Sequence, residues 1–324
     1  MKIFDSDTTR ELMPFDRLIK ALCLMFIEGC VVPTRHVHAV GPSHAPAGTV
    51  LIMPAWNDTY LGVKTVNIFP ANAERGLSSL FSTYLLYDAR TGAPVAQFDG
   101  NEITSRRTAA ASALAASRVA RPDASRLLVI GAGRVGQLIP QAYGAVLPIE
   151  EVSVWDRSEA QAGALVAELQ SLGVRATIAA RLDQAVAQAD IVCCATLATT
   201  PVVQGAWLAE GSHLDLIGSF TPNMREADDA CFAGARIYID TEEALEKSGD
   251  LLGPISRGVF APGDVEGTLA SLCAQPTGSR PEGSRTVFKS VGTALEDLAA
   301  AILVYEAGHM TRIDTSSPPR VVIN

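Results

Sequence analysis

Three glycines form the pattern in this sequence whose chemistry is clearest. Residues 131–136 read Gly-Ala-Gly-Arg-Val-Gly, a complete G-x-G-x-x-G sequence, and the apolar run LLVI precedes it. A strand before the motif and a helix after it are the context in which such a loop binds the pyrophosphate of a dinucleotide. Gly131 would permit the tight turn, Gly133 would let the pyrophosphate approach the backbone, and Gly136 would let the helix pack closely on the strand. The N-terminus of that helix would stabilise the phosphate charge.

An acid stands where such a site needs one for the ribose. Asp156 follows the second strand, 151–155, and lies 20 residues beyond Gly136. A carboxylate at this point can accept hydrogen bonds from the ribose hydroxyls of NAD. Arg157 and Ser158 come directly afterwards, and an arginine here can hold the 2′-phosphate of NADP. The residues therefore predict an NAD(P)-dependent oxidoreductase and leave the choice between NAD and NADP open.

The elements around the motif alternate between strand and helix from Arg126 onward. Apolar runs that predict strands alternate with helical patterns such as 158–172 and 292–310. This rhythm is typical of a parallel sheet covered by helices on both faces. The strands are expected at 127–130, 151–155, 176–180, 191–196, 214–218, 236–240 and 286–290.

The first part of the chain, to about Val119, has a different pattern. A helix is expected over 15–30, and an alanine-rich helix over 104–119 ends at the Arg-Pro-Asp sequence 121–123. Residues 88–92 have the composition of a hairpin turn. Sequential strands of this kind predict an antiparallel or mixed sheet in an α+β region. They are expected at 49–54, 61–70, 79–87 and 94–98.

Composition limits the classes of function. The 324 residues suggest about two domains, and 48% hydrophobic residues can build a sizeable core. The net charge of −9 disfavours nucleic acid and anionic membranes as partners. The N-terminal residues lack the basic and then apolar character of a signal peptide, and no apolar run could span a bilayer, so we expect a cytoplasmic protein. The six cysteines are expected to be reduced thiols, and His36 and His38 have no carboxylate at ligand spacing, so no metal site is expected.

Several longer stretches, taken together, resemble the ornithine cyclodeaminase/mu-crystallin family. They are VVPTRH (31–36), MPAW (53–56), LGVKTVNIFPAN (61–72), FDGNEITSRRTAAASALA (98–115), VWDRS (154–158), CCATLATTPVV (193–203), IGSFTPNMREAD (217–228) and FKSVGTALEDLAAA (288–301). The resemblance covers nearly the whole chain in order. It implies an α/β fold in which a Rossmann doubly wound parallel sheet, 120–295, is inserted in a smaller α+β substrate-binding and dimerisation domain, 1–119 plus 296–324. It also implies a homodimer.

The resemblance places a substrate clamp on three basic residues: Arg35, Lys64 and Arg107. Arg107 can hold a carboxylate through two parallel hydrogen bonds, and Arg35 adds a second fork. Lys64 beside these cations would have a lowered pKa and could exchange a proton at the reacting nitrogen or carbonyl. Arg107 is preferred to Arg106 because Thr108 follows it, as in the family. The substrate is then a small amino or imino acid.

The same resemblance implies further residues along the cofactor. They are Thr108, Arg134, Val135, Thr196, Leu197, Ile217 and Ser290. Thr196 follows the run IVCCA (191–195), at the edge of the sheet where ligands bind. Lys289, next to Ser290, is given no role, since an alternating strand position can simply be exposed.

One position departs from the cyclodeaminases of this family. They carry an aspartate in a glycine-glycine-aspartate segment that is thought to assist the deaminating ring closure, whereas the segment here reads Gly218-Ser219-Phe220. Phenylalanine cannot act as an acid or base, and neither Asp215, Asp228 nor Asp229 obviously replaces the missing carboxylate.

The departure favours hydride transfer at a carbon–nitrogen centre next to a carboxylate. The predicted activity is NAD(P)H-dependent reduction of a ketimine or imino acid, such as Δ1-pyrroline-2-carboxylate. The alternatives are ornithine cyclodeamination to proline and ammonia, an alanine-dehydrogenase-like reaction, and non-enzymatic binding of a small molecule.

Overall fold

The computed structural model describes residues 1–275 and 283–315 and divides into two compact units. The mixed-sheet unit comprises 1–21, 29–104 and the chain from Ala294 onward. The parallel-sheet unit comprises 22–28 and 105–293. The division at Thr104 falls inside helix α3 (Gly100–Val119), whereas the sequence predicts the first domain boundary at residues 119 and 120.

The mixed-sheet unit is built on a six-stranded sheet in the order β1-β6-β5-β4-β3-β2. β1 pairs with β6 in parallel and the other neighbours are antiparallel, which confirms the predicted mixed sheet. The sequence analysis missed β1, which is too short for a periodic pattern, and β2, which is exposed at every position and therefore has no alternation. The strands are β1 (Lys2–Phe4), β2 (His36–Val40), β3 (Gly48–Trp56), β4 (Tyr60–Ile68), β5 (Leu80–Asp88) and β6 (Pro94–Asp99).

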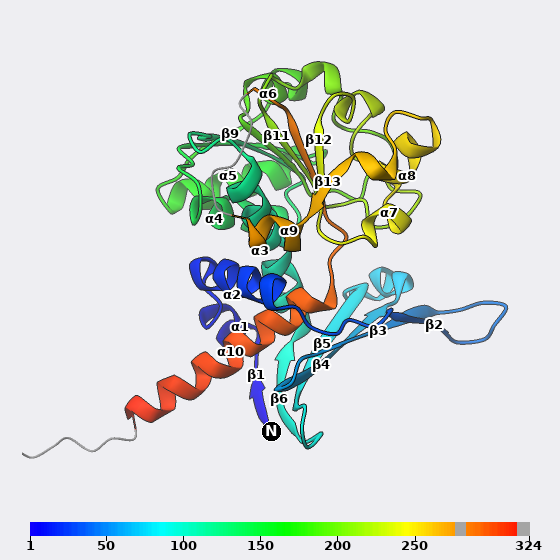
Figure 1. Ribbon diagram of the computed structural model, residues 1–324, viewed down its shortest axis with the longest axis vertical. Helices are drawn as coiled ribbons and strands as arrows, with labels where there is room; N and C mark the ends of the chain where they lie inside the picture. The colour runs from blue at the N-terminus through cyan, green and yellow to red at the C-terminus, as the bar shows by residue number, and fades with distance from the viewer. Residues whose placement is uncertain (276–282, 316–324) are drawn as a thin grey trace, which may run out of the picture. The chain divides into compact units, whose positions relative to one another are not determined.

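Helices at both ends of the chain complete this unit (Figure 1). α1 (Ser6–Glu11) is capped by the side chain of Asp5, which accepts a hydrogen bond from the backbone of Thr8. α10 (Ala294–Thr315) packs on β3, β4 and β5, so the last described helix covers strands formed near the start of the chain. α2 (Phe15–Glu28) begins in this unit and ends in the other, and the 3-10 turn η1 (Pro70–Arg75) lies between β4 and β5.

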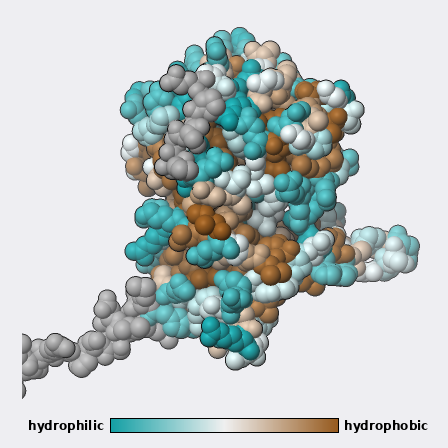
Figure 2. Space-filling model, in the orientation of Figure 1, coloured by the Kyte–Doolittle hydropathy of each residue, from teal (hydrophilic) through white to brown (hydrophobic). Residues whose placement is uncertain are grey.

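The hairpin formed by β2 and β3 leaves an unpaired edge on this sheet. Its tip, residues 41–47, is exposed and is coloured teal to white in Figure 2, as expected for a solvated loop. β2 itself carries two exposed valines, Val37 at 59% and Val40 at 37%. An edge strand with exposed apolar side chains is able to pair with another chain.

The parallel-sheet unit has eight strands in the order β13-β12-β14-β11-β10-β7-β8-β9, all parallel. The strand order reverses between β7 and β10, which is the switch point at which doubly wound sheets bind ligands. The predicted Rossmann sheet is therefore confirmed, with β13 as an unpredicted edge strand. The strands are β7 (Arg126–Ile130), β8 (Glu151–Trp155), β9 (Arg175–Ile178), β10 (Ile191–Cys194), β11 (His213–Leu216), β12 (Arg236–Ile239), β13 (Val265–Thr268) and β14 (Thr286–Lys289).

The interior of the parallel-sheet unit follows from its strand sequences. The central strands β7, β10, β11, β12 and β14 are buried at nearly every position, whereas β8 and the edge strands β9 and β13 are partly exposed. Apolar side chains of the central strands join those of the covering elements in one core. α5 (Glu159–Ser171) packs on β8 and β9. The remaining elements are α6 (Leu182–Gln188), α7 (Ala244–Lys247), α8 (Gly249–Ser256), α9 (Leu269–Ala274) and the 3-10 turns η3 (Gly205–Trp207), η4 (Asp229–Cys231) and η5 (Pro262–Asp264).

Two helix predictions need correction. α3 begins at Gly100, four residues early, because the Asp99 carboxylate accepts a hydrogen bond from the backbone of Glu102 and starts the helix there. The helix predicted after the glycine motif is not continuous: it consists of a 3-10 turn, η2 (Gly136–Leu138), followed by the short α4 (Ile139–Gly144). Pro140 explains the break, because it has no N–H to donate and is tolerated only in the first turn of a helix.

Candidate active site

The loops that follow β7, β8 and β10 surround a cleft of about 480 Å³ at the carboxyl edge of the parallel sheet. The glycine-rich loop follows β7, Asp156 follows β8, and residues 195–200 follow β10. Because these strands flank the switch point, the cleft lies where a dinucleotide binds in this architecture. Its lining comprises Gly131, Gly133, Trp155, Asp156, Arg157, Gln161, the segment 195–200 and Val202.

The three motif glycines differ in the space that the structure leaves around them. Gly131 has φ +99°, and a Cβ there would lie 2.6 Å from the carbonyl oxygen of Ala195. A Cβ on Gly136 would lie 1.8 Å from the carbonyl oxygen of Gly131, so only glycine allows this close packing. A Cβ on Gly133 would meet nothing within 4 Å. Packing within the protein therefore does not require a glycine at position 133. Gly133 borders the cleft, as expected of a backbone that a pyrophosphate approaches closely.

The Asp156 carboxylate forms hydrogen bonds both with the glycine-rich loop and with the start of the loop that follows β8. Its Oδ2 accepts a hydrogen bond of 2.8 Å from the backbone N–H of Ala132, and its Oδ1 accepts one of 2.7 Å from that of Ser158. Each carboxylate oxygen has a second lone pair, so ribose hydroxyls can still be bound. Arg157 is exposed beside it. These residues suit either nicotinamide cofactor.

The predicted cofactor residues divide into two groups. Gly131, Gly133, Asp156, Arg157, Thr196 and Leu197 line the cleft. Thr108, Arg134, Val135, Gly136, Ser158, Ile217 and Ser290 do not line it. Ile217 and Ser290 nevertheless lie at the carboxyl ends of β11 and β14, at the same edge of the sheet. The lining residues that were not predicted include Trp155 and Thr199, which lie in family stretches but were given no role, and Gln161, which lies outside those stretches.

Lys64 forms a buried ion pair in the mixed-sheet unit. Its side chain is only 2% exposed, and Nζ lies 2.6 Å from Oδ2 of Asp297, which is fully buried on α10. Nζ also donates to the hydroxyl of Thr104 at 3.3 Å. Burial raises the pKa of the nearby Tyr84 hydroxyl well above its usual range, and the charge of Asp297 adds to that effect.

This ion pair changes the expectation for Lys64. From the sequence, Lys64 is expected among cations that would favour the neutral amine. An adjacent carboxylate stabilises the protonated ammonium instead. Lys64 is thus paired with a buried carboxylate, and Asp297 was not among the predicted site residues.

The two arginines of the predicted clamp have different surroundings. Arg107 is 6% exposed, and its guanidinium fills the space beside Gly292: a Cβ on that glycine would lie 2.5 Å from Nη1. Gly292 follows β14, so Arg107 reaches the carboxyl edge of the parallel sheet. Arg35 is half-buried just before β2, in the same unit as Lys64.

The three aspartates considered as replacements for the cyclodeaminase carboxylate, Asp215, Asp228 and Asp229, all have other partners. Asp215 is fully buried in β11, where it accepts hydrogen bonds from Tyr143 at 2.6 Å and from Cys193 at 3.2 Å. Phe220 itself is 48% exposed.

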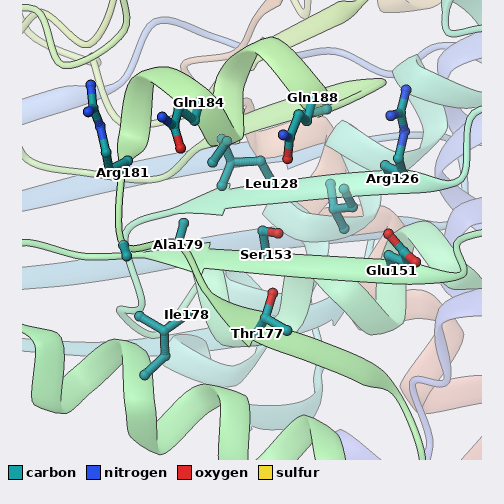
Figure 3. A pocket seen from close by; sticks show the side chains of 14 residues that line it. Arg126, Leu128, Glu151, Ser153, Thr177, Ile178, Ala179, Arg181, Gln184 and Gln188 are labelled. Carbon is teal, nitrogen blue, oxygen red and sulfur yellow. The ribbon is translucent and has the colours of Figure 1, made fainter.

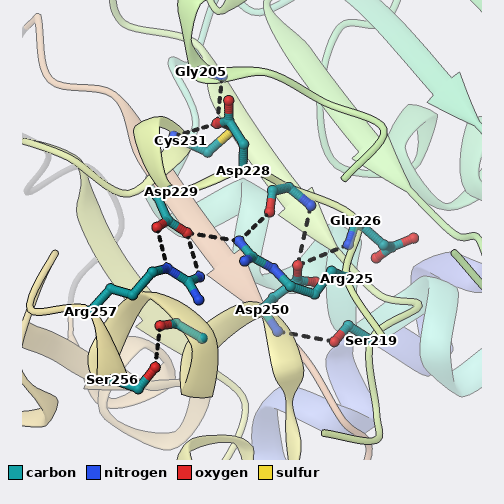
Figure 4. A network of polar contacts seen from close by, with 12 residues as sticks. Gly205, Ser219, Arg225, Glu226, Asp228, Asp229, Cys231, Asp250, Ser256 and Arg257 are labelled. Atoms are coloured by element: carbon teal, nitrogen blue, oxygen red, sulfur yellow. Dashed lines mark hydrogen bonds and ion pairs between the residues drawn. The ribbon is translucent and has the colours of Figure 1, made fainter. Parts of the chain in front are cut away.

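The other two aspartates have structural partners (Figure 4). Asp228 accepts hydrogen bonds from the backbone of Gly205 and Cys231. Asp229 is paired with Arg257, and with Arg225 as well, and these contacts lower its pKa to about 2. All three carboxylates are therefore engaged in other hydrogen bonds or ion pairs.

A second hollow, of about 330 Å³, lies between α6 and the strands β7, β8 and β9 (Figure 3). It has two arginines, but Arg126 is bonded to Asp190 and Arg181 to Asp183. We assign it no ligand. Lys289, which the sequence analysis left as a possibly exposed strand residue, is fully buried, and its ammonium donates to the carbonyl of Leu216 at 2.8 Å.

Among residues 1–275 and 283–315, no three His, Cys, Asp or Glu side chains are grouped as a metal site requires. Within the same described ranges, no helix has the length and apolar character needed to cross a membrane.

An eight-stranded parallel sheet with a glycine-rich loop and a cleft at its switch point defines a protein with the Rossmann dinucleotide-binding fold. The model of the ornithine cyclodeaminase/mu-crystallin family matches residues 25–311, and the chain belongs to that family. The resemblance noted in the sequence is thereby confirmed.

The chain is also similar to individual proteins whose activity is given in their names. The chain is 41% identical over 280 residues to a Δ1-pyrroline-2-carboxylate reductase of Paracoccus denitrificans, covering 85% of this chain and 88% of the relative. It is 34% identical over 312 residues to one of Colwellia psychrerythraea, covering 94% and 99%. A solved structure of the Thermococcus litoralis Δ1-pyrroline-2-carboxylate reductase with NADH and L-proline superposes with a TM-score of 0.89 at 32% identity, covering 96% of this chain and 98% of that one.

Proposed function

We propose that this protein is an NAD(P)H-dependent imino-acid reductase whose substrate is Δ1-pyrroline-2-carboxylate or a close analogue. The relatives named above carry this activity in their names. The observation in this chain that supports it most directly is the buried pair of Lys64 and Asp297, because imine reduction needs a proton donor and this pair keeps the lysine protonated. The parallel-sheet unit would bind the cofactor, and the mixed-sheet unit would supply substrate-binding residues and the dimer contact.

The basic residues have complementary roles in this proposal. The guanidinium of Arg107 holds the substrate carboxylate through two parallel hydrogen bonds, and Arg35 provides a second fork. Holding the carboxylate fixes the adjacent carbon–nitrogen double bond in position, which removes much of the entropic cost of reaction. Reduced nicotinamide, when bound, supplies a hydride. Gly131, Gly133 and Asp156 are the residues of the cleft that would hold its pyrophosphate and ribose.

Lys64 completes the balance of the reaction. The carbon of the C=N bond gains a hydride and the nitrogen gains the proton of the Lys64 ammonium, so the imine becomes a secondary amine. Deprotonated Lys64 would leave Asp297 as an uncompensated buried charge, which is costly. Lys64 is therefore driven to take up a proton again before the next turnover.

The missing acid separates this reaction from cyclodeamination. Cyclodeamination in the family relies on an aspartate where this chain has Phe220, and Asp215, Asp228 and Asp229 have other partners. Hydride transfer to an existing imine does not require that acid, because the substrate already has its C=N bond.

One assay tests the proposal. NADH and NADPH absorbance are followed with Δ1-pyrroline-2-carboxylate, while ammonia release is measured from ornithine with NAD. We expect cofactor oxidation in the first reaction and no ammonia in the second. Ammonia release without net cofactor oxidation would show a cyclodeaminase, and tight cofactor binding without turnover of any imino or amino acid would show a binding protein.

Substrate binding is tested separately with Arg107→Ala. The variant should lose saturation by the imino acid and keep its affinity for NADH, because the guanidinium is assigned to the substrate carboxylate alone. Arg181→Ala, which removes an exposed arginine of the same unit, is the matched control. Loss of both affinities in Arg107→Ala would contradict the assigned role.

We also propose that the protein is a homodimer joined through the mixed sheet. The exposed edge strand β2, with Val37 and Val40, supports this assembly. Light scattering after size exclusion should give twice the mass of the chain, and Val37→Lys should shift the mass toward the monomer.

A further inference from the structure

Glu226 is a fully buried glutamate to which the proposed reaction gives no role. Its Oε1 accepts hydrogen bonds from the backbone N–H of Thr196 at 2.7 Å and from the Thr196 hydroxyl at 2.8 Å. Its Oε2 accepts one from the backbone N–H of Gly218 at 2.6 Å. Thr196 and Gly218 each lie two residues beyond a strand, β10 and β11 respectively. One carboxylate therefore ties together the two loops that leave neighbouring strands at the ligand-binding edge.

The backbone around Glu226 fastens the same segment again. The carbonyl oxygen of Glu226 accepts hydrogen bonds from the N–H groups of Val202 and Val203, at 2.8 and 2.9 Å. The N–H of Arg225 donates to the carbonyl of Ala198 at 2.8 Å. The segment 196–203 is thus held at its beginning, middle and end by two consecutive residues. Most of this segment lines the cleft.

The backbone of Glu226 is fixed by hydrogen bonds to a second buried acid, Asp250. Oδ1 of Asp250 accepts hydrogen bonds from the N–H of Glu226 at 2.9 Å and of Ala227 at 3.1 Å, and the N–H of Asp250 donates to Ser219 (Figure 4). A Cβ on Gly218 would lie 1.8 Å from the carbonyl oxygen of Thr196, so the two loops are in direct contact. The carboxylate cannot shift without moving both loops.

We propose that Glu226 is a positioning residue for the dinucleotide, whose carboxylate holds the segment 196–203 in the shape that forms one wall of the cofactor cleft. Glu226 acts through Thr196 and Gly218 and need not touch the cofactor. This inference rests on the proposed function only in taking NAD(P)H as the ligand of the cleft.

The variant Glu226→Gln tests it with little change in shape. An amide has one oxygen and one NH2 group, so whichever way it is turned, the NH2 faces the N–H of either Thr196 or Gly218. One buried N–H is then left without an acceptor, which is costly. We expect the Kd for NADH, measured by fluorescence without substrate at about pH 8.5, where the Glu226 carboxyl is ionised, to rise about tenfold. The KM for the imino acid should stay within about twofold of wild type, because Arg35, Lys64 and Arg107 are untouched.

Two controls separate positioning from general loss of stability. Glu246→Gln makes the same change at an exposed position of α7 and should leave the Kd unchanged. Leu269→Ala opens a cavity in buried α9, away from the network, and should lower the Tm without changing the Kd. If Leu269→Ala weakens NADH binding as much as Glu226→Gln does, destabilisation explains the effect and the inference is wrong.

A milder variant decides the matter if Glu226→Gln does not fold. Thr196→Val removes one of the three donors and keeps the backbone N–H, so it should weaken NADH binding by about threefold. Unchanged NADH affinity in the folded variant would overturn the inference. Failure of the proposed reaction looks different: the wild type would then bind NADH and fail to reduce the imino acid, while the effect on Kd would persist.

Discussion

The buried pair of Lys64 and Asp297 makes a quantitative prediction. At 2.6 Å and an effective dielectric constant of about 20, the two charges attract by about 6 kcal/mol. Desolvation of both groups offsets much of this attraction, since the side chains are 2% and 0% exposed. Asp297→Asn leaves the Lys64 ammonium buried without its counter-charge. We therefore expect Asp297→Asn to lower the free energy of unfolding by about 3 to 5 kcal/mol.

The assay is a double-mutant cycle with Lys64→Met, measured by urea unfolding and by hydrogen exchange of the amides of β3 and β4, which report on this unit. The double variant removes both charges, so it should be more stable than the sum of the single effects predicts, with a coupling energy of about 2 to 3 kcal/mol. Glu306→Gln, which removes an exposed carboxylate from the same helix, is the matched control. Additive single effects would refute the reasoning that this pair is a mutually compensated buried charge.

Three further results are expected. Gly133→Val should leave the Tm unchanged and weaken NADH binding more than about tenfold, because the valine side chain would extend into the cleft. Gly136→Ala should instead lower the Tm, since its Cβ would lie 1.8 Å from the carbonyl oxygen of Gly131. Equal Tm values for the two variants would contradict this difference. Burial raises the pKa of Glu226 to about 7 from 4.5, so the folded state holds that proton more tightly and loses this stabilisation as the pH rises from about 4.5 to 7. The free energy of unfolding of wild type relative to Glu226→Gln should accordingly fall by about 3 kcal/mol between pH 5 and pH 8 in urea titrations, and a rise would contradict the assignment. Asp156→Ser should increase kcat/KM for NADPH relative to NADH, because a carboxylate repels the 2′-phosphate; an unchanged ratio would show that Asp156 does not set the preference.

Features carried by local sequence could be predicted, and the structure confirms them. The Rossmann sheet was identifiable because its strands are continuous apolar runs and because the glycine motif is contiguous. The separate reasons for Gly131, Gly133 and Gly136 also follow from the motif alone. Where local geometry depends on a single residue, as at Pro140 and Asp99, the helix limits were wrong by several residues.

Features that depend on distant residues could not be predicted. Asp297 lies in an apolar helical pattern near the end of the chain, and nothing in its neighbourhood points to Lys64. Glu226 stands in a run of acidic residues that is typical of a solvated loop, and its role depends on where β10 and β11 end. Lys289 was ambiguous because an alternating strand position can face either side until the sheet around it is known.

The place of Asp297 in the chain has a consequence for how the protein is made on the ribosome. Lys64 and the strands β3, β4 and β5 emerge before the parallel-sheet unit, yet the helix that covers them and pairs with the lysine is synthesised after that unit. Nearly all of the parallel-sheet unit is complete by then. The nascent chain must therefore carry an open, charged sheet while its other half folds, and a truncation before α10 would lose the first-made unit and spare the later one.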